Sequence, residues 1–388
     1  MSWREVHLGD VIRLKRGHDL PSSDRVPGEI PIVSSSGVTG FHNVAKVAGP
    51  GVVTGRYGTL GEVHYIEGDY WPLNTALYVE DFKGNQPRYV AYLLMTLELG
   101  SQNAAGAVPG VNRNTLHQMT VCVPDEETQR RIVEVLSAYD DLIAINQRRI
   151  ALLEDAARRL YREWFVHLRF PSHESVPVKD GVPEGWLSLT LGDVCDAVGG
   201  GTPSTARPEY WGGDVTWVTP TDVTRNDCLV LLDSEKKITE AGLANSSAKL
   251  VPPETILMTS RASIGFFALM DKPACTNQGF ISVLPKQDSA RMFLLFNLLD
   301  RVEEMIGLAT GATFKELSKK TFRALPVLWP TDALLKFYED KTYPLIQQVR
   351  LIKKQNQELT KARDQLLPKL MSGQLDVSGI ALPDEVAA

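Results

Sequence analysis

The sequence lacks the motifs that identify many enzymes and metal proteins. No G-x-x-x-x-G-K-[ST] loop is present to bind nucleotide phosphates, and neither a G-x-S-x-G elbow nor an H-E-x-x-H pair occurs. An amino-methyltransferase needs an Asn/Asp-Pro-Pro-aromatic tetrapeptide, but here Pro252 and Pro253 stand between a valine and a glutamate. The seven histidines are scattered, with no pair at the spacing of metal ligands. These absences disfavour a catalytic centre and a metal site.

Cysteine is scarce, and long apolar runs are missing. The four cysteines are far apart and form no C-x-x-C pair, so we expect reduced, mostly buried thiols in a cytoplasmic protein. No apolar run approaches the roughly 18 residues that cross a bilayer, so no membrane contact is expected. The net charge of −6 leaves no basic excess for strong, sequence-independent DNA binding. A basic face that is balanced by acidic faces elsewhere remains compatible with this charge.

The residues that are present indicate a two-domain globular protein. At 388 residues the chain exceeds one ordinary hydrophobic core, and its 43% apolar and 23% charged residues are typical of soluble domains. Short strand-like runs between Gly/Pro/Ser turns alternate with helical patterns, which predicts an α/β (α+β) fold. In the first globular stretch we expect strands at residues 6–14, 30–34, 51–54, 63–66, 73–79 and 119–123, and a helix at 87–99.

Two long helices are predicted from a narrow apolar seam that occurs twice. Between residues 132 and 164 the seam positions alternate in steps of four and three, and the same spacing returns at residues 338–370. Helices of about 35–40 residues are about 50–60 Å long, and each seam is most simply buried against the other in an antiparallel coiled coil. The predicted seam comprises Ile132, Leu136, Tyr139, Ile143, Asn146, Ile150, Leu153, Leu160 and Trp164 in the first helix, and Leu345, Val349, Ile352, Asn356, Leu359, Leu366 and Leu370 in the second.

The ends and the interior of these helices carry further predictions. Asp125 and Thr331 are suitable N-caps for the first and second helix. Pro344 is expected to kink or break the second helix, which would leave residues 331–342 as a separate helix. The polar seam residues Asn146 and Asn356 are expected to fix the register of the pair at some cost in stability.

The globular stretches that precede the two helices also repeat each other. The segment LGDV occurs at residues 8–11 and 191–194, and the loop TGRYGTLG at 54–61 returns, one residue shorter, as TSRASIG at 259–265. This alignment equates Arg56 with Arg261. Asn74 similarly returns as Asn277, and the glycine-rich segment 106–114 returns as 310–315. A duplicated unit of about 200 residues predicts two similar heads and two similar helices with pseudo-two-fold symmetry.

Several of these segments resemble a known family. GGTPS at residues 200–204, EYWGG at 209–213 and WV at 217–218 are similar to the start of a target-recognition domain. Residues 141–165 and 356–373 resemble two helical regions of the same family, and RYGTLG at 56–61 is similar to one of its loops. Over nearly its whole length, the chain resembles the specificity subunit of type I restriction–modification systems.

The resemblance implies a larger complex in which this chain recognises DNA and other subunits carry out catalysis. Each head would read one half of a bipartite double-stranded DNA target, with the helices as the spacer. Two methyltransferase subunits that bind S-adenosylmethionine, and two restriction/translocase subunits that use ATP and Mg, would dock onto this chain. The chain itself would bind no cofactor and catalyse no reaction. The implied boundaries are residues 1–123 and 169–328 for the two recognition domains (the second with its linker), 124–168 and 329–375 for the spacer helices, and 376–388 for the tail.

Candidate base-reading side chains are polar or basic residues on the loops of the heads. In the first head they are Ser34, Ser35, Ser36, Arg56, Tyr57, Asn74, Asn112, Arg113 and Asn114. In the second they are Thr219, Thr221, Arg225, Arg261, Ser263, Asn277, Gln278 and Lys315. Each has a plain alternative, because serine and asparagine in loops most often bond to their own backbone. Two other functions also stay open: a two-headed scaffold that binds proteins, and a metal-dependent nuclease with dispersed acidic ligands.

Overall fold

The described chain forms two compact units. The computed structural model describes residues 2–97, 99–101, 110–311 and 314–377. Unit 1 combines Met1–Ile143 with Glu358–Ala388, and unit 2 comprises Ala144–Gln357. The division falls within both long helices, whereas the sequence placed domain boundaries at the helix ends. Parts of the predicted glycine-rich segments (106–109 and 312–313) and the tail from residue 378 lie outside the described residues.

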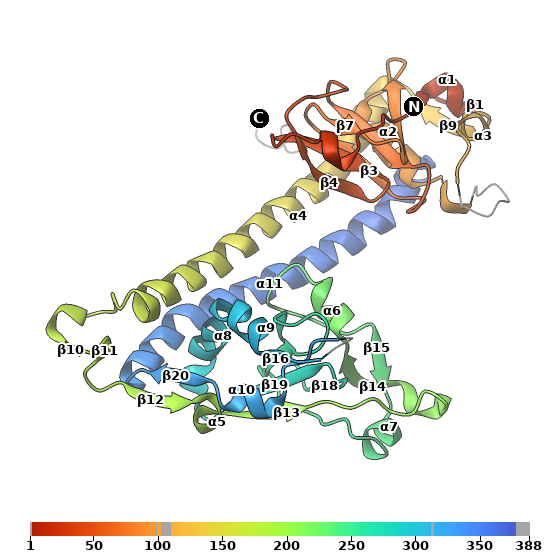
Figure 1. The fold of residues 1–388 in the computed structure, drawn as a ribbon. Coiled ribbons are helices and arrows are strands. Elements are labelled where there is room, and N and C mark those ends of the chain that lie inside the picture. Colours follow the sequence, from red (N-terminus) through yellow and green to blue (C-terminus); the bar gives the residue numbers. More distant parts are fainter. Residues whose placement is uncertain (1, 98, 102–109, 312–313, 378–388) are drawn as a thin grey trace. The chain divides into compact units, whose positions relative to one another are not determined.

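Unit 1 is built from small sheets and short helices (Figure 1). Its strands are β1 (Trp3–His7), β2 (Arg13–Arg16), β3 (Ile30–Ser34), β4 (Gly37–His42), β5 (Gly51–Gly55), β6 (Val63–Ile66), β7 (Trp71–Pro72), β8 (Ala76–Asp81) and β9 (Thr120–Pro124). Its short helices are α1 (Leu8–Val11), α2 (Pro87–Met95) and α3 (Arg113–His117). The strand orders are β1-β9, β2-β8-β5-β6 and β4-β3-β7, and β3 runs antiparallel to β4 but parallel to β7.

Unit 2 repeats this topology and adds the two-stranded sheet β10-β11. Its strands are β10 (Val178–Lys179), β11 (Val182–Pro183), β12 (Leu187–Thr190), β13 (Cys195–Gly199), β14 (Trp211–Val218), β15 (Lys236–Ile238), β16 (Ile256–Thr259), β17 (Phe267–Leu269), β18 (Cys275–Thr276), β19 (Phe280–Pro285) and β20 (Pro326–Trp329). Its short helices are α5 (Leu191–Val194), α6 (Pro220–Thr224), α7 (Glu240–Ala244), α8 (Arg291–Asp300), α9 (Val302–Leu308) and α10 (Lys319–Arg323). The orders β12-β20, β13-β19-β16-β17 and β15-β14-β18 match those of unit 1, with β14 antiparallel to β15 and parallel to β18. The predicted internal repeat is confirmed.

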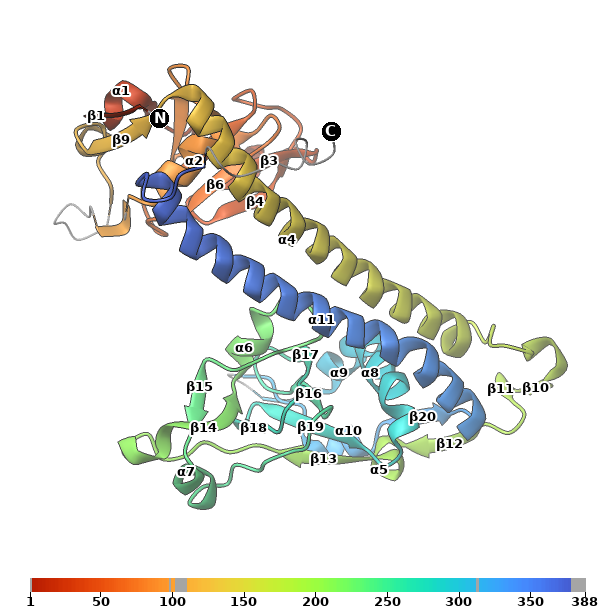
Figure 2. The ribbon, with the colours of Figure 1, turned by 180° about the vertical axis from the view of Figure 1, so that it is seen from behind.

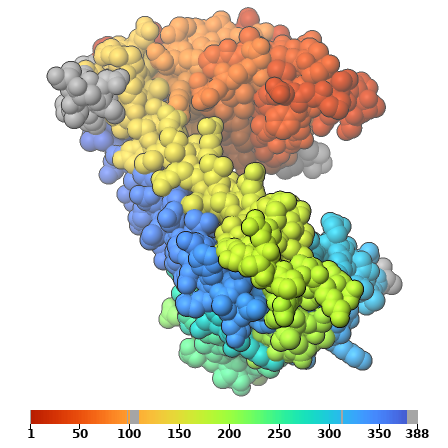
Figure 3. Space-filling view, turned by 90° about the vertical axis from the view of Figure 1, so that its left-hand side faces the viewer, coloured from red at the N-terminus to blue at the C-terminus, as the bar shows by residue number. Residues whose placement is uncertain are grey.

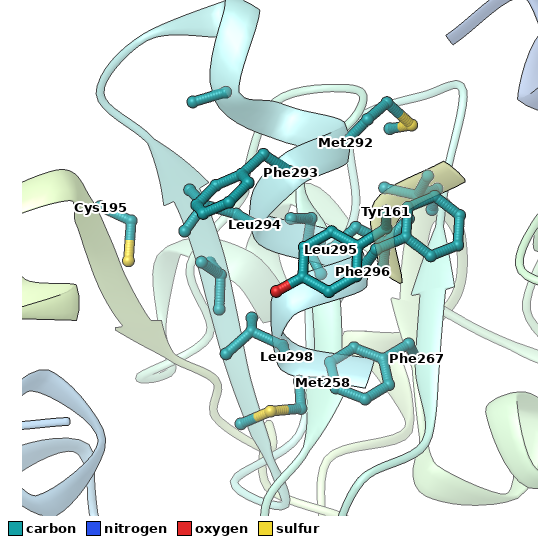
Figure 4. Packing of buried hydrophobic residues seen from close by; sticks show 14 of the residues in the cluster. Tyr161, Cys195, Met258, Phe267, Met292, Phe293, Leu294, Leu295, Phe296 and Leu298 are labelled. Carbon is teal, nitrogen blue, oxygen red and sulfur yellow. The ribbon is translucent and has the colours of Figure 1, made fainter. Parts of the chain in front are cut away.

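The core of unit 2 forms around α8, whose sequence is apolar on every side. Its side chains from Met292 to Phe296 are at most 1% exposed, as expected for a helix that is hydrophobic all round. Figure 4 shows Tyr161 of the first long helix beside them, and the Tyr161 hydroxyl accepts a hydrogen bond from Asn297 Nδ2 over 2.9 Å. In unit 1, α2 has the equivalent place in the chain and is buried from Tyr89 to Leu94.

Two long helices, α4 (Glu126–Tyr161) and α11 (Asp332–Met371), contribute to both units. In unit 2 they run antiparallel (Figure 2), because Asn146 Nδ2 donates to Asn356 Oδ1 over 2.8 Å while the Tyr338 hydroxyl donates to Ala157 O over 2.9 Å. Both N-caps are as predicted from the sequence. Asp125 Oδ1 accepts from Thr128 N at 2.9 Å, and Thr331 Oγ1 accepts from the Leu334 N–H at 3.4 Å.

In unit 1 the remaining halves of α4 and α11 also meet in antiparallel orientation. Arg363 Nη1 donates to Asp140 Oδ1 over 2.7 Å. The predicted seam positions are buried at Ile132, Leu136, Asn146, Ile150, Trp164, Val349, Ile352 and Leu370, and half-buried at Tyr139, Ile143, Leu153, Leu160, Leu345, Asn356, Leu359 and Leu366. Trp164 lies in η3 (Arg162–Val166), a π-helical turn at the end of α4. The seam therefore faces protein along its length.

The predicted break at Pro344 is wrong, because α11 is a single helix through this position. Proline lacks the N–H that would bond to the carbonyl oxygen of Asp340, so one backbone hydrogen bond is lost. Thr342 and Ile346, which flank Pro344, are both 0% exposed, and Pro344 itself is exposed. The packing of the flanking residues holds the helical conformation that a proline would end in an isolated peptide.

The predicted strands agree best for two short runs that turn residues bound. The predicted strands 30–34 and 63–66 coincide with β3 and β6, whereas α1 divides the expected strand 6–14 into β1 and β2. Leu8 and Val11 are both 0% exposed, and one helical turn brings residues at this spacing to the same side. The expected strand 73–79 begins at Ala76, the expected helix 87–99 ends at Met95, and β4 and β7 were not predicted.

The linker between η3 and β12 packs onto its own unit. Phe170 and Trp186 are 5% and 7% exposed, with ring centroids 5.5 Å apart. Figure 3 shows this segment, in yellow-green, against the first turns of α11 in blue. Between them lies a hollow of about 350 Å³ that is lined by Phe170, Trp186, Leu334 and Phe337 among others.

Candidate nucleic-acid interface

Four loops of unit 1 meet through backbone hydrogen bonds, and they contain the residues predicted there except Arg113 and Asn114, which begin α3. Arg56 N donates to Thr75 O over 2.9 Å, and Val111 N donates to Arg56 O over 3.0 Å. On the neighbouring sheet, Leu73 N donates to Val33 O over 2.8 Å. These bonds tie together the end of β3, the loop after β5, the segment before β8 and the segment before α3. We name this group of loops cluster 1.

Unit 2 contains the same arrangement, which we name cluster 2. Ser260 N donates to Gly279 O over 2.7 Å, and Leu317 N donates to Ser260 O over 2.9 Å. Asn277 N donates to Val218 O over 3.2 Å. Each bond has its counterpart in cluster 1, so the two clusters share one backbone framework and differ in the side chains that it carries.

This framework corrects the residue-level repeat that the sequence predicted. Arg56 and Ser260 make the same pair of backbone bonds, so Arg56 corresponds to Ser260 and not to Arg261. Arg261 takes the place of Tyr57, since both make the next isolated β-bridge along the chain. By the same bonds, Leu73 corresponds to Asn277, so Asn74 is not its counterpart.

The loop after the third strand of each four-stranded sheet has the same length in both units, so the predicted one-residue deletion is also wrong. Gly61 and Gly265 have φ values of +89° and +90°, and four residues of each loop lie between them and Arg56 or Ser260. Gly58 and Ala262 likewise match, at +82° and +62°. An alignment of Arg56 with Arg261 requires a one-residue gap in this loop. The matching positions of the residues with positive φ exclude such a gap.

The basic residues of cluster 1 are held by neutral partners. The Arg56 guanidinium carbon lies 4.5 Å from the centre of the Tyr57 ring, and Arg56 Nη2 donates to the Tyr57 hydroxyl over 3.3 Å. Arg113 Nε and Nη2 both lie 3.3 Å from Asn114 Oδ1. In the described part of the chain, no carboxylate forms an ion pair with either arginine. Both guanidinium groups therefore keep an uncompensated charge.

Other predicted residues of cluster 1 mainly support the loops themselves. Ser34 and Ser35 are each 8% exposed, and Ser34 Oγ lies 3.1 Å from the Oγ of Ser36, which is exposed. Asn112 is the N-cap of α3, and its Oδ1 accepts a hydrogen bond from the N–H of Asn114 over 2.9 Å. Asn114 is itself one of the predicted residues. Asn74 Nδ2 donates to an aspartate carboxylate of the same unit. These short polar side chains have partners within unit 1, and their contact with DNA stays a prediction.

A neighbouring basic group of unit 1 was not predicted from the sequence. Lys15 Nζ lies 2.5 Å from Glu80 Oε1, and this hydrogen bond, with the charge of Glu80, raises the pKa of Lys15. His18 forms a β-bridge with Leu73 of cluster 1. Burial, together with the charges of Lys46 and Lys15, lowers the pKa of His18, so this ring is neutral at physiological pH. No sequence motif identifies Lys15 or His18, because it is β-strand pairing in the folded chain that brings them close to cluster 1.

Cluster 2 differs chiefly by an insertion that begins at α6. Thr219 is the N-cap of α6, and its Oγ1 and N donate to Asp222 Oδ2 over 2.6 and 2.7 Å. Asp222 Oδ1 also accepts from Glu235 N over 2.8 Å, so one carboxylate closes both ends of the insertion. Thr221 and Arg225 on α6 are exposed. Asp222 was not predicted, although its spacing of three from Thr219 is the signal of a capping box.

The remaining predicted residues of cluster 2 have mixed roles. Arg261 Nε lies 3.8 Å from Glu316 Oε2, which partly compensates its charge. Asn277 Oδ1 accepts from a backbone N–H over 2.9 Å, Gln278 Oε1 accepts from Thr202 Oγ1 over 2.7 Å, and Ser263 is half-buried. The exposed Lys315 contributes its carbonyl oxygen to the framework, and no carboxylate partner of its ammonium group is found among the described residues.

Metal-site and membrane-spanning features are absent from the described ranges. No group of three or more His, Cys, Asp or Glu side chains there is arranged to hold a metal ion. Within the same residues, no helix is both long enough and apolar enough to cross a membrane. Cys195, Cys228 and Cys275 are buried, Cys122 is exposed, and none of the four is in a disulfide.

The duplicated clusters coincide with the ranges that a family comparison identifies. The model of the family described as "Type I restriction modification DNA specificity domain" matches residues 1–155 and 183–361, and each range contains one cluster. This chain is a type I restriction–modification specificity subunit. The family that the sequence motifs resembled is thereby confirmed.

Individual specificity subunits are similar over different parts of the chain. The HindI specificity subunit of Haemophilus influenzae is 21% identical over 95% of this chain and 94% of its own length. The MjaIX specificity subunit of Methanocaldococcus jannaschii is 36% identical, but over 39% of this chain and 35% of its own length. The crystal structure of an S subunit from M. genitalium covers 95% of this chain with a TM-score of 0.60 at 15% identity, which shows the shared fold.

Proposed function

We propose that this specificity subunit reads a bipartite double-stranded DNA target, with cluster 1 on one half-site and cluster 2 on the other. The observation that carries the proposal is the shared backbone framework of the clusters and their different side chains. Base pairs present different donor and acceptor patterns in the major groove, so one framework with two side-chain sets suits two different half-sites. The helices α4 and α11 serve as the spacer.

The uncompensated cations are the strongest candidates for DNA contact. Arg56, Arg113, Arg225 and Lys315 have no carboxylate partner among the described residues, and all except the half-buried Arg56 are exposed. Guanidinium groups make two parallel hydrogen bonds to guanine O6 and N7 or to phosphate oxygens. With a net charge of −6, the chain leaves much of the phosphate contact to partner subunits.

The partners in this proposal are two methyltransferase and two restriction/translocase subunits. S-adenosylmethionine belongs to the former and ATP with Mg to the latter, so this chain binds no cofactor and performs no catalysis. Exposed apolar side chains on the helices support a docking role. Ile145 of α4 and Leu351 of α11, which are 206 residues apart and thus equivalent in the repeat, are 53% and 67% exposed. Leu152 of α4 is 68% exposed.

Methylation by the reconstituted complex tests the proposal. The chain alone, given labelled S-adenosylmethionine and DNA, should transfer no methyl group, and addition of its methyltransferase partner should yield adenine methylation at an interrupted, asymmetric sequence. Replacing residues 1–123 by those of a related subunit should change one half-site and leave the other intact. Methyl transfer or metal-dependent cleavage by the pure chain would refute the non-catalytic role, and an unchanged half-site after the exchange would favour a protein-binding scaffold.

A further inference from the structure

The turn that follows α6 is fastened to both long helices within unit 2. Lys353 of α11 donates from Nζ to Asp227 Oδ1 over 2.9 Å and also to Asn226 Oδ1. Glu154 of α4 accepts from Leu229 N at its Oε1 over 2.6 Å. Two ionisable side chains, one from each helix, thus bond to Asn226, Asp227 and Leu229 of the recognition domain. We name this arrangement the α6 clamp.

The clamped turn is tightly organised. Asn226 Nδ2 donates to Val230 O over 3.0 Å and to Cys228 O, and Cys228 is 9% exposed. The Lys353 side chain is 14% exposed, and a charge withdrawn this far from water is stable only with good hydrogen-bond partners. A turn with these internal bonds moves as one piece, so it transmits its position to the residues beside it.

The α6 clamp lies directly beside candidate DNA-reading residues. Arg225, the exposed C-cap of α6, immediately precedes the clamped Asn226. At the other end of α6, Pro220 lies close to Gly279 of cluster 2, since a Cβ built on that glycine would be 3.1 Å from Pro220 Cγ. The five residues of α6 span about 7.5 Å, so the helix directly connects cluster 2 with the clamp.

Unit 1 has no element that corresponds to this connection in its described residues. Its β3 and β4 are joined by the short turn after Ser34, whereas the equivalent strands β14 and β15 are joined by α6 and the loop that Asp222 closes. A contact that acts through α6 therefore affects only the recognition domain of unit 2. That asymmetry supplies a direct test.

We propose that Glu154 and Lys353 are positioning residues for the second half-site: they hold α6, and with it Arg225, in the orientation that reads DNA. The inference rests on the proposed function, because it requires cluster 2 to contact DNA. Neither residue touches DNA in this proposal. Both act through the turn that they fasten.

The test uses the complex of this chain with its methyltransferase partner and the target sequence mapped from its methylation pattern. Lys353→Met removes the donors while keeping an unbranched side chain. Lys354→Met is the matched control, since Lys354 also bonds from α11 to this recognition domain, with Nζ 2.6 Å from Asp271 Oδ2, but not to α6. DNA affinity and methylation KM are measured on the intact target and on targets changed in either half-site.

We expect Lys353→Met to weaken binding of the intact target about tenfold and to raise KM more than it lowers kcat. On a target already changed in the second half-site, the further loss should be far less than tenfold, because that reading is already absent. On a target changed in the first half-site, the tenfold loss should remain. Lys354→Met should leave all three affinities within about twofold.

A second pair of variants separates positioning from folding. Glu154→Gln keeps an acceptor for Leu229 N and should preserve reading of the second half-site, whereas Glu154→Leu should reproduce the half-site-specific loss. Thermal unfolding of each variant identifies one that fails to fold. Equal losses on targets changed in either half-site, or none for folded Lys353→Met, would overturn the inference. If the wild-type complex shows no sequence-specific binding at all, the proposed function fails instead.

Discussion

Several polar side chains of the two clusters form hydrogen bonds within the turns to which they belong. Ser34, Asn112 and Asn277 each bond to nearby groups of their own loops, as short polar side chains usually do. The sequence identified these loops, but it could not show which basic side chains keep an uncompensated charge, because the fold supplies the possible partners. The structure shows that Arg56 and Arg225 have no carboxylate partner among the described residues.

Replacement of Arg56 tests the contact that cluster 1 is predicted to make with a base. The guanidinium is preorganised on the Tyr57 ring, and among the described residues it has no carboxylate partner to release before it binds DNA. We expect Arg56→Ala to weaken target binding by about 1–3 kcal/mol and to abolish discrimination at one base pair of the first half-site. Fluorescence anisotropy with single-base variants of the target measures both effects.

Arg13→Ala is the control for this prediction, because Arg13 is exposed but lies 2.8 Å from Glu80 in an ion pair. Its loss should leave affinity nearly unchanged. A uniform weakening of all sequences by Arg56→Ala, with a salt slope reduced by about one, would contradict base reading and indicate a phosphate contact.

Glu154 predicts a pH dependence of stability. Burial raises its pKa from the ordinary 4.5 to about 7, against the lowering effects of Leu229 N, Arg158 and Lys353, and Asp227 adds a smaller raising effect. The folded chain therefore binds a proton that the unfolded chain has released, and this group's stabilisation falls as pH rises from about 4.5 to about 7. Glu154→Gln should raise the free energy of unfolding at pH 8 by about 1–3 kcal/mol relative to wild type.

Urea unfolding at pH 5 and pH 8 measures this effect. The difference between Glu154→Gln and wild type should be small at pH 5 and larger at pH 8. Glu174→Gln, at an exposed carboxylate of the same unit, should show no pH-dependent difference. A Glu154→Gln variant that is equally shifted at both pH values would show that the carboxylate is not protonated in the folded chain.

At the scale of elements, sequence patterns predicted the strands and helix starts that local interactions determine. Turn residues on either side located β3 and β6, and the cap residues Asp125 and Thr331 located the starts of α4 and α11. The continuous helix through Pro344 and the short helix α6 were not predicted, because both depend on tertiary packing. A proline is tolerated when its neighbours are buried, and a five-residue helix is stable only when its ends are bonded elsewhere.

The Asn146–Asn356 pair gives the element-scale prediction. Asn146→Leu removes the donor that Asn356 Oδ1 accepts at 2.8 Å, so we expect a loss of about 1–3 kcal/mol in unfolding free energy. Replacing both asparagines by leucine should recover that loss, because the double variant buries neither amide in the seam, while the register becomes less specific. Thermal unfolding of the two single variants and the double variant gives the coupling energy.

Gln147→Leu provides the comparison, because Gln147 is the next residue of α4 and is exposed. It should change the unfolding free energy by less than about 0.5 kcal/mol. Additive losses in the double variant would mean that the two asparagines do not support each other in the folded protein.

At the scale of the whole chain, the repeat was predictable because the helices keep a constant spacing. Asp125 and Thr331 are 206 residues apart, whereas Val33 and Val218 are 185 apart and Arg56 and Ser260 are 204 apart. The difference between the last two, 204 − 185, places 19 extra residues in unit 2 between β14 and β16, where α6 and α7 lie. Insertions in loops have no periodicity, so only the fold revealed which residues correspond.

The spacer role proposed for the helices makes a prediction about the target as a whole. Deleting one heptad from each helix, residues 141–147 and 355–361, removes Asn146 and Asn356 together and preserves the phase of the seam. Seven residues of helix are about 10 Å, which corresponds to about three base pairs. We expect the tolerated gap between half-sites to shorten by about three base pairs while the recognised bases stay the same. Methylation of a DNA library with varied gaps measures this. An unchanged gap would show that the helices do not set the spacing, and altered half-sites would show that the deletion had disturbed the clusters.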